Sequence, residues 1–355
     1  MVSTKSLLTT ACLLFSVAVD AHPHPPTNPN VLFARSENAK RCSDQVGAMK
    51  TKRHQMRKRQ ELEKRGLRPG IDDVDTTYVI HAEAPKYDFL KNDTCVLTPE
   101  VTQGPYWYPP RELLRQNIVE DQVGVPLELE IGIIDVNSCE PVDNVLISIW
   151  HCNSTGSYSA FAYDPNTPFE TLLQGQGIYN TSGYDNFAFL ANRQTTFLRG
   201  MWPTDEHGVT SFNSIFPGFY IERSIHIHVQ VHTDWNITRN GTVGTSRVVE
   251  TGQIFFAEEL EREIMALEPY SSHTEIERTT NVGDGIFAQV VNSGAMANVD
   301  TEPLDGVDYK NGVLAYITLG IETTTIKNGT TASPIGITAL NETDPDINPL
   351  DYKKH

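Results

Sequence analysis

After its first residues the sequence has no apolar run long enough to cross a membrane as a helix. The one short run, residues 7–19, follows Lys5 and ends near the small residues Val19 and Ala21. This order is typical of a secretory signal peptide, so residues 1–21 are expected to direct export. The chain is therefore predicted to be secreted and extracellular, with no membrane partner.

Positive charge is scarce outside one segment. Between Arg35 and Arg68 there are 12 Lys and Arg against 4 Asp and Glu, whereas the rest of the chain after residue 21 has 15 basic and 40 acidic residues. A body this acidic argues against nucleic acid as a partner, because phosphates would be repelled. Residues 22–70 are interpreted as a basic, helical N-terminal segment: a solvated helix, or a pro-region removed at the dibasic pair Lys40-Arg41.

Cysteines are also few. Apart from Cys12 in the signal, the chain has Cys42, Cys95, Cys139 and Cys152. An even number in an oxidising compartment favours two disulfides over a thiolate metal site, with three pairings possible. Cys139 and Cys152 are expected at opposite ends of one strand, too far apart to bridge. The favoured pairing is therefore Cys42–Cys139 with Cys95–Cys152.

Seven glycosylation sequons agree with export and predict a glycoprotein. They lie at Asn92, Asn153, Asn180, Asn236, Asn240, Asn328 and Asn341. The last two fall in a Thr-, Asn- and Pro-rich stretch, and residues 326–355 are predicted to form a disordered, glycosylated tail.

Short apolar runs predict a mainly β domain over residues 71–325. In residues 127–133, Leu and Ile alternate with Glu and Gly, as in a strand with one buried face. Further strand-like runs lie at residues 145–150, 208–215, 224–232, 252–256 and 313–321. Many short strands joined by long loops indicate a β-sandwich, preceded by the short helical segment. Residues 258–267 are predicted to be a helix, and the chain has no internal repeat.

One predicted strand carries the first candidate for chemistry. His226, His228, Gln230 and His232 share one of its faces, because side chains alternate with a period of two. His226 and His228 are close enough to share a metal ion, whereas His232 lies about 13 Å beyond His228 along a strand. An isolated His-x-His is more often a polar strand face with satisfied imidazoles, so the pair alone leaves the function open.

The residues around this pair form blocks that are far more specific. The blocks are Leu97-Thr98-Pro99-Glu100, Gly104-Pro105-Tyr106, Cys139-Glu140-Pro141-Val142, Ile149-Trp150-His151-Cys152-Asn153, Gly156-Ser157-Tyr158-Ser159, Phe197-Leu198-Arg199-Gly200, Thr204-Asp205-Glu206-His207-Gly208, Ile215-Phe216-Pro217-Gly218-Phe219-Tyr220 and Arg223-Ser224-Ile225-His226-Ile227-His228. Over residues 95–321 this series resembles the intradiol ring-cleavage dioxygenases, and most of all their secreted fungal-type members.

The resemblance implies a mononuclear iron(III) site whose metal ligands are Tyr158, Tyr220, His226 and His228. A phenol with a pKa near 10 ionises when it binds a trivalent cation. Phenolate oxygen, being hard, suits iron(III), and imidazole completes the site. No organic cofactor is implied.

The resemblance also implies the reaction. A catechol-type aromatic diol would bind iron through both oxygens while Tyr220 leaves and accepts a proton. O2 would then insert between the two hydroxylated carbons and give a muconate-type diacid. Arg223 would stabilise developing negative charge, its alternative role being a strand-end salt bridge. Gln253 would support the site, or simply hydrogen-bond within its strand.

Two features stay open. Ile221 follows Tyr220 where the intracellular bacterial members have Pro, and only residues 221–225 separate Tyr220 from His226. The substrate pocket should therefore differ, and the particular catechol is not carried over. Two other hypotheses are a zinc-dependent hydrolase at the histidine pair, which the tyrosines argue against, and a secreted β-sandwich binding module with a degenerate metal site.

Overall fold

The structure is a computed structural model. It describes residues 41–64, 101, 104–108, 113–161, 164–175, 177, 179–180, 195–237, 242–292, 297–323 and 338–339. The predicted signal peptide, Cys95, the block at residues 97–100 and most of the predicted tail lie outside the described residues.

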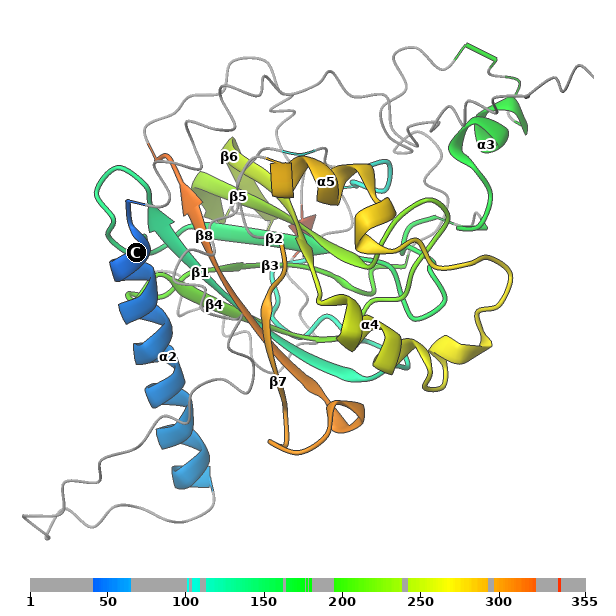
Figure 1. The fold of residues 1–355 in the computed structure, drawn as a ribbon. Coiled ribbons are helices and arrows are strands. Elements are labelled where there is room, and N and C mark those ends of the chain that lie inside the picture. Colours follow the sequence, from blue (N-terminus) through cyan, green and yellow to red (C-terminus); the bar gives the residue numbers. More distant parts are fainter. Residues whose placement is uncertain are drawn as a thin grey trace, which may run out of the picture.

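Two β-sheets form the body of the molecule (Figure 1). The first has the order β4-β1-β8-β7 and contains β1 (Pro126–Asp135), β4 (Val209–Ile215), β7 (Asp300–Pro303) and β8 (Val313–Ile321). The second has the order β3-β2-β5-β6-β9 and contains β2 (Leu146–Trp150), β3 (Arg199–Pro203), β5 (His226–Ile237), β6 (Thr242–Phe255) and β9 (Thr338–Ala339). The predicted mainly β sandwich is confirmed.

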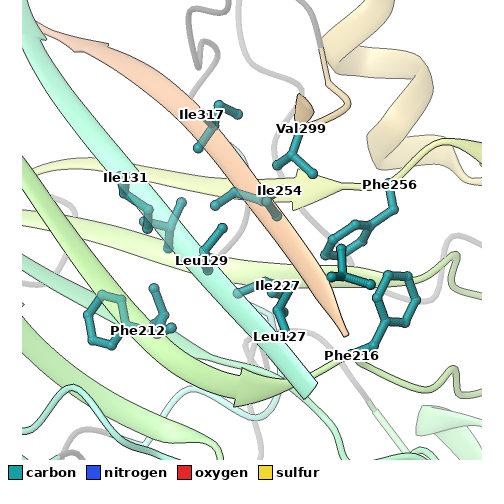
Figure 2. Close-up of a cluster of buried hydrophobic side chains, with 14 of the residues drawn as sticks. Leu127, Leu129, Ile131, Phe212, Phe216, Ile227, Ile254, Phe256, Val299 and Ile317 are labelled. Atoms are coloured by element: carbon teal, nitrogen blue, oxygen red, sulfur yellow. The ribbon is translucent and has the colours of Figure 1, made fainter. Parts of the chain in front are cut away.

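The core lies between the two sheets because each strand presents alternate residues to it. On β1 the side chains of Leu127, Leu129 and Ile131 are at most 1% exposed. Figure 2 shows them facing Ile227 of β5 and Ile254 of β6. The predicted alternation is confirmed on both strands, and it turns the histidines of β5 to the outer face of its sheet.

Pairing within the sheets fixes which side chains are neighbours. β1 pairs antiparallel with β4 and parallel with β8. In the second sheet β5 is central, antiparallel to both β2 and β6. The edge strands β3 and β7 were not predicted, since Arg199–Pro203 and Asp300–Pro303 are short and show no clean alternation.

The helices lie outside the sandwich. They are α2 (Ser43–Lys64), α3 (Phe169–Gly175), α4 (Glu258–Met265) and α5 (Gly285–Asn292), with short 3-10 turns η3 (Tyr270–Ser272), η4 (Asn281–Gly283) and η5 (Tyr309–Asn311). The helix predicted over residues 258–267 is confirmed as α4, and α5 was not predicted. None of the described helices combines the length and apolar character that a membrane span requires.

Helix α2 lies beside the first sheet (Figure 1). Its basic side chains anchor it there. Arg57 pairs with Glu128 at 2.5 Å and Glu130 at 3.0 Å, on the outer face of β1. Nearer the start of the helix, Lys50 pairs with Asp300 at 2.6 Å. Arg53 is buried and its Nη2 donates to Thr318 Oγ1 at 3.0 Å. The basic segment therefore complements the acidic sheet instead of lying free in solvent.

Of the favoured disulfide pairing, one half holds. Cys42 and Cys139 are bonded, with Cα atoms 5.1 Å apart. The pairing of Cys95 with Cys152 is wrong, because Cys152 is a free, buried thiol whose Sγ donates to the Gly218 carbonyl at 3.4 Å. Burial raises the pKa of this thiol to about 12. Cys152 lies just after the end of β2 and contacts the loop that contains Gly218. The spacing of the cysteines does not reveal this placement.

The disulfide should contribute measurably to stability. It links residues 97 positions apart, and removing a bridge that closes so long a loop typically costs about 2–5 kcal/mol. We expect a C42S/C139S double variant to lose a free energy of unfolding in this range in urea titrations. Thiol alkylation of the unfolded, unreduced wild type should label Cys152 and spare Cys42 and Cys139. Labelling of Cys42 would contradict the bridge.

Candidate metal centre

The site lies on the outer face of the second sheet, where β2, β5 and β6 run side by side (Figure 1). His228 of β5 stands opposite Trp150 of β2 and Gln253 of β6, and His226 stands opposite Phe255. Residues directly opposite one another share a face, so these side chains form one layer. The layer is buried, with His226 2% and His228 0% exposed.

Four side-chain donors converge above this layer. His226 Nε2 lies 3.1 Å from His228 Nε2, and Tyr158 Oη lies 3.1 Å from the same His228 Nε2. Tyr220 Oη lies 3.3 Å from His226 Nε2. Ligands about 2 Å from one first-row metal ion lie about 3 Å from one another, so this spacing fits a single ion. The residues predicted as metal ligands are thus brought together.

Two loops deliver the tyrosines, and two glycines let these loops touch. Gly218 N donates to the Asn153 carbonyl at 3.1 Å, and a Cβ on Gly218 would lie 2.5 Å from that oxygen. Gly156 has φ +87°, and a Cβ there would lie 2.3 Å from the Phe219 carbonyl oxygen. Such distances are shorter than any real contact, so both positions require glycine. Backbone packing of the two loops sets Tyr158 beside Tyr220.

Asn153 holds the first of these loops in place. Its Oδ1 accepts hydrogen bonds from the backbone N–H of Thr155 at 3.1 Å and of Ser157 at 2.9 Å. Its Nδ2 donates to Gln122 Oε1 at 3.0 Å. The amide of this predicted sequon is thus engaged in the turn before Tyr158.

Aromatic rings enclose the donors. Tyr106 stacks on Tyr158 with ring centroids 4.3 Å apart and meets the ring of Tyr220 edge-on at 5.7 Å. Trp150 stacks on His228 at 4.9 Å. On His228, Gly104 approaches so closely that a Cβ would lie 2.6 Å from Cε1. These contacts fix the ring orientations and surround the donors with apolar groups.

Burial sets the protonation of the donors. His226 Nδ1 lies 2.7 Å from the Ser224 carbonyl, which can only accept, so Nδ1 carries the proton and Nε2 turns its lone pair to the centre. Burial, reinforced by Arg223, lowers the pKa of His226 to about 3. Burial raises the pKa of Tyr220 to about 12 and that of Tyr158 well above its usual value. Without a cation, both phenols therefore stay protonated and His226 stays neutral.

Arg223 belongs to the site itself. It is 3% exposed, and its Nη1 lies 3.5 Å from His226 Nε2. Its Nη2 donates to Gln253 Oε1 at 2.5 Å, so the two predicted supporting residues contact each other. Its Nε donates to Asp284 Oδ2 at 2.7 Å, which means that the salt bridge weighed for Arg223 exists, but in the interior.

Asp284 was not predicted. It is 0% exposed and lies 61 residues after Arg223, immediately before α5. The one available signal was local: Asp284-Gly285 precedes the apolar run Ile286-Phe287, a pattern typical of a helix N-cap. That pattern indicates a helix start and says nothing of Arg223.

The converging donors are two imidazoles and two phenols. Among the described residues, no group of three or more His, Cys, Asp or Glu side chains is arranged to hold a metal ion. A cavity of about 880 Å³ lies between α2 and the turn joining β3 to β4, and none of the four donors lines it. Among the described residues, the candidate metal ligands therefore lie together at the buried layer over β5.

No protein-family model and no curated protein matches the chain. Among solved structures, an intradiol ring-cleavage dioxygenase from Tetranychus urticae matches with a TM-score of 0.52 and 27% identity, over 66% of this chain and 98% of its own. A second structure, described as a dioxygenase, matches with the same values.

Together, the two-sheet fold and these two neighbours indicate that the protein is an oxidoreductase of the dioxygenase class. More narrowly, the Tetranychus urticae neighbour is described as an intradiol ring-cleavage dioxygenase, and the resemblance seen in the sequence blocks is confirmed.

His232 offers a test of how burial controls this face. Neither of its ring nitrogens has a hydrogen-bond partner among the described residues, and burial lowers its pKa to about 3. In the unfolded chain the pKa of the His232 imidazole is near 6.5, so between pH 6.5 and 3 the unfolded state binds more protons than the folded state. Stability therefore falls as the pH falls through this window.

We expect His232→Leu to weaken this acid sensitivity by up to about 1.4 kcal/mol per pH unit, without loss of stability at pH 7.5, because it removes an unpaired buried polar group. The free energy of unfolding, measured in urea at several pH values, checks the slope. A wild-type slope in the variant would mean that His232 does not titrate as described.

Proposed function

We propose that the protein is a non-haem iron(III) dioxygenase that cleaves catechol-type aromatic diols. Cleavage falls between the two hydroxylated carbons and yields muconate-type diacids, with both atoms of O2 incorporated. The observation that carries the proposal is the convergence of two phenol oxygens and two imidazole nitrogens at 3.1–3.3 Å. The reaction class is supported by the intradiol ring-cleavage dioxygenase from Tetranychus urticae and by the second dioxygenase structure.

The donor set fits iron(III) better than zinc. Tyr158, Tyr220, His226 and His228 would hold the ion, and structural zinc sites more often use thiolates, imidazoles and carboxylates. When bound, iron(III) would supply a Lewis-acidic, redox-active centre that makes the diol reactive toward O2. Loading releases the two phenol protons, so iron affinity should increase with pH.

Tyr220 is the group that moves a proton. Because burial raises its pKa to about 12, its oxygen strongly favours the protonated form once it is not held by a cation. A diol hydroxyl that arrives at the centre can therefore give its proton to Tyr220 Oη. Tyr158 is stacked under Tyr106 and remains in place as the second phenol.

Arg223 and Gln253 have separate roles in this proposal. Burial disfavours a charged guanidinium, but Asp284 together with Tyr220 and Tyr158 outweighs burial and raises the pKa of Arg223, so the group remains cationic. Its Nη1 faces the centre at 3.5 Å from His226 Nε2, where it would stabilise negative charge that develops on the substrate. Gln253 would hold the guanidinium in that orientation through Nη2.

We further propose that the protein works outside the cell. The Cys42–Cys139 disulfide supports this, because such bridges persist in oxidising compartments.

The decisive experiment measures iron and turnover together. Purified protein loaded with iron should be red-brown from tyrosinate-to-iron charge transfer, and should consume O2 with catechols while a ring-opened diacid accumulates. Zinc-bound or empty protein would be colourless. Absence of O2 uptake across a panel of simple and substituted catechols, in protein that holds iron, would refute the proposed activity.

Tyr158→Phe tests the ligand assignment. Loss of one phenolate ligand should lower iron affinity at least about tenfold and weaken the charge-transfer band. Mutating a residue that only hydrogen-bonds a metal ligand already lowers metal affinity by about that factor. Tyr179→Phe is the matched control, since Tyr179 is 81% exposed and should keep wild-type colour. Full colour in Tyr158→Phe would remove Tyr158 from the ligand set.

A further inference from the structure

We propose that Asp284 is the positioning residue of this site, holding Arg223 directly and His226 through Ser224. The catalytic meaning of this inference rests on the proposed dioxygenase function. Its physical basis is a set of contacts between buried groups on the connection before β5 and the start of α5.

Asp284 accepts four hydrogen bonds, two on each carboxylate oxygen. Oδ1 accepts from the backbone N–H of Ile286 at 2.8 Å and of Phe287 at 2.9 Å, which caps α5. Oδ2 accepts from Arg223 Nε at 2.7 Å and from the backbone N–H of Ser224 at 2.9 Å. One oxygen therefore serves the helix and the other serves the metal centre.

The first contact of Asp284 Oδ2 orients Arg223. Its guanidinium is held at Nε by Asp284 and at Nη2 by Gln253, 2.5 Å away. With two of its three nitrogens fixed, the planar group presents Nη1 to His226 Nε2 at 3.5 Å. Gln253 alone would leave the guanidinium free to swing about one hydrogen bond.

The second contact of Asp284 Oδ2 orients His226 through Ser224. Asp284 holds Ser224 by its N–H, and the Ser224 carbonyl accepts the Nδ1 proton of His226 at 2.7 Å. A hydrogen bond at one ring nitrogen fixes the tautomer and the direction of the other, here the lone pair on Nε2. The orientation of a proposed ligand thus depends on a carboxylate that does not touch it.

The same contacts steady the short connection from Tyr220. Glu222 has φ +65°, in the left-handed region, and Arg223 N donates to the Tyr220 carbonyl at 3.3 Å. A turn this tight, with a non-glycine residue at positive φ, needs outside support. Asp284 binds the two residues that follow the turn, so it also limits how Tyr220 is presented.

Asp284 is itself held from the side away from the centre. Its backbone N donates to the Asn281 carbonyl at 3.1 Å. Asn281 Nδ2 donates to the Phe256 carbonyl at 2.7 Å, and its backbone N donates to Glu258 Oε2 at 3.1 Å. Arg278 in turn bonds both Glu258 and Glu261 of α4. The carboxylate is therefore fixed to the sandwich independently of the groups that it orients.

Asp284→Asn separates the two duties of the residue. Asn caps a helix as well as Asp does, so α5 should persist, whereas the charge that holds Arg223 is lost. We expect iron affinity or kcat to fall about 10- to 100-fold, with KM for catechol changed less, and the charge-transfer band to shift. Val290→Ala is the control: Val290 is a buried residue of α5 that belongs to an apolar cluster without Asp284, Arg223 or His226, and the variant should match the wild type per bound iron.

A second variant guards against misfolding of the first. Arg223→Lys keeps both charges and the Asp284–Ser224 contact but removes the two-point hold on the guanidinium. It should lower kcat while iron affinity stays near the wild-type value. ¹⁵N NMR of the metal-free full chain gives a reading without iron: His226 should be a single Nδ1–H tautomer in the wild type and in Arg223→Lys, and a mixture in Asp284→Asn.

Each result decides the matter. Wild-type iron affinity, colour and kcat in Asp284→Asn would overturn the inference, and so would an equal loss in Val290→Ala, which would reduce Asp284 to a helix cap. If the wild type neither binds iron nor cleaves catechols, the proposed function fails. The NMR comparison then still decides on Asp284, and an unchanged His226 tautomer in Asp284→Asn would refute its positioning role.

Discussion

The site depends on strand β5 being buried on both faces. Its inner face supplies apolar side chains to the sandwich core, while its outer face carries His226 and His228 beneath a layer of aromatic rings. An imidazole removed from water is costly to protonate, so burial keeps His226 neutral with a lone pair available. The alternation that builds the core thus also places a pair of candidate metal-binding nitrogens on the outer face. Any slip of β5 by one residue would turn both imidazoles into the core and destroy the two functions together.

A rigid strand supplies only half of the donors, and the other half comes from loops whose geometry is set by close packing. Gly156 and Gly218 allow the two loops to touch backbone to backbone, closer than any side chain permits. Tyr106 then covers Tyr158, and Trp150 supports His228. Tyr106 also meets Tyr220 edge-on and the Ser224 carbonyl holds His226, so the four donors keep their spacing although they arise from three separate segments. Rigidity of this kind prepares a site before any ion arrives, since little side-chain freedom is left to lose.

How far the sequence predicts such a site depends on whether the information is local. The alternation of β5 and of β1 could be predicted because a strand face is defined by neighbours two residues apart. Tyr158 and Tyr220 could be chosen only through the motif blocks, since nothing in a lone tyrosine distinguishes a ligand from a core residue. Asp284 was missed because its partner Arg223 is 61 residues away and its own surroundings indicate only a helix start. The wrong pairing of Cys152 has the same cause: its contact with Gly218, 66 residues further along the chain, leaves no trace in the spacing of the cysteines.

The charges of the buried site constrain what it can accept. Arg223 and Asp284 neutralise each other, and burying either without the other would be strongly unfavourable. The Arg223–Asp284 pair therefore adds no net charge, although the guanidinium still places a local positive potential at His226. Imidazoles bind a metal ion in their neutral form, so two phenolates would offset only part of the charge of a trivalent cation and leave the centre positive. A buried centre of that kind favours a ligand that can lose protons on arrival, as a diol can and a plain aromatic ring cannot. In the proposed reaction Tyr220, whose pKa is raised by burial, would accept one of those protons.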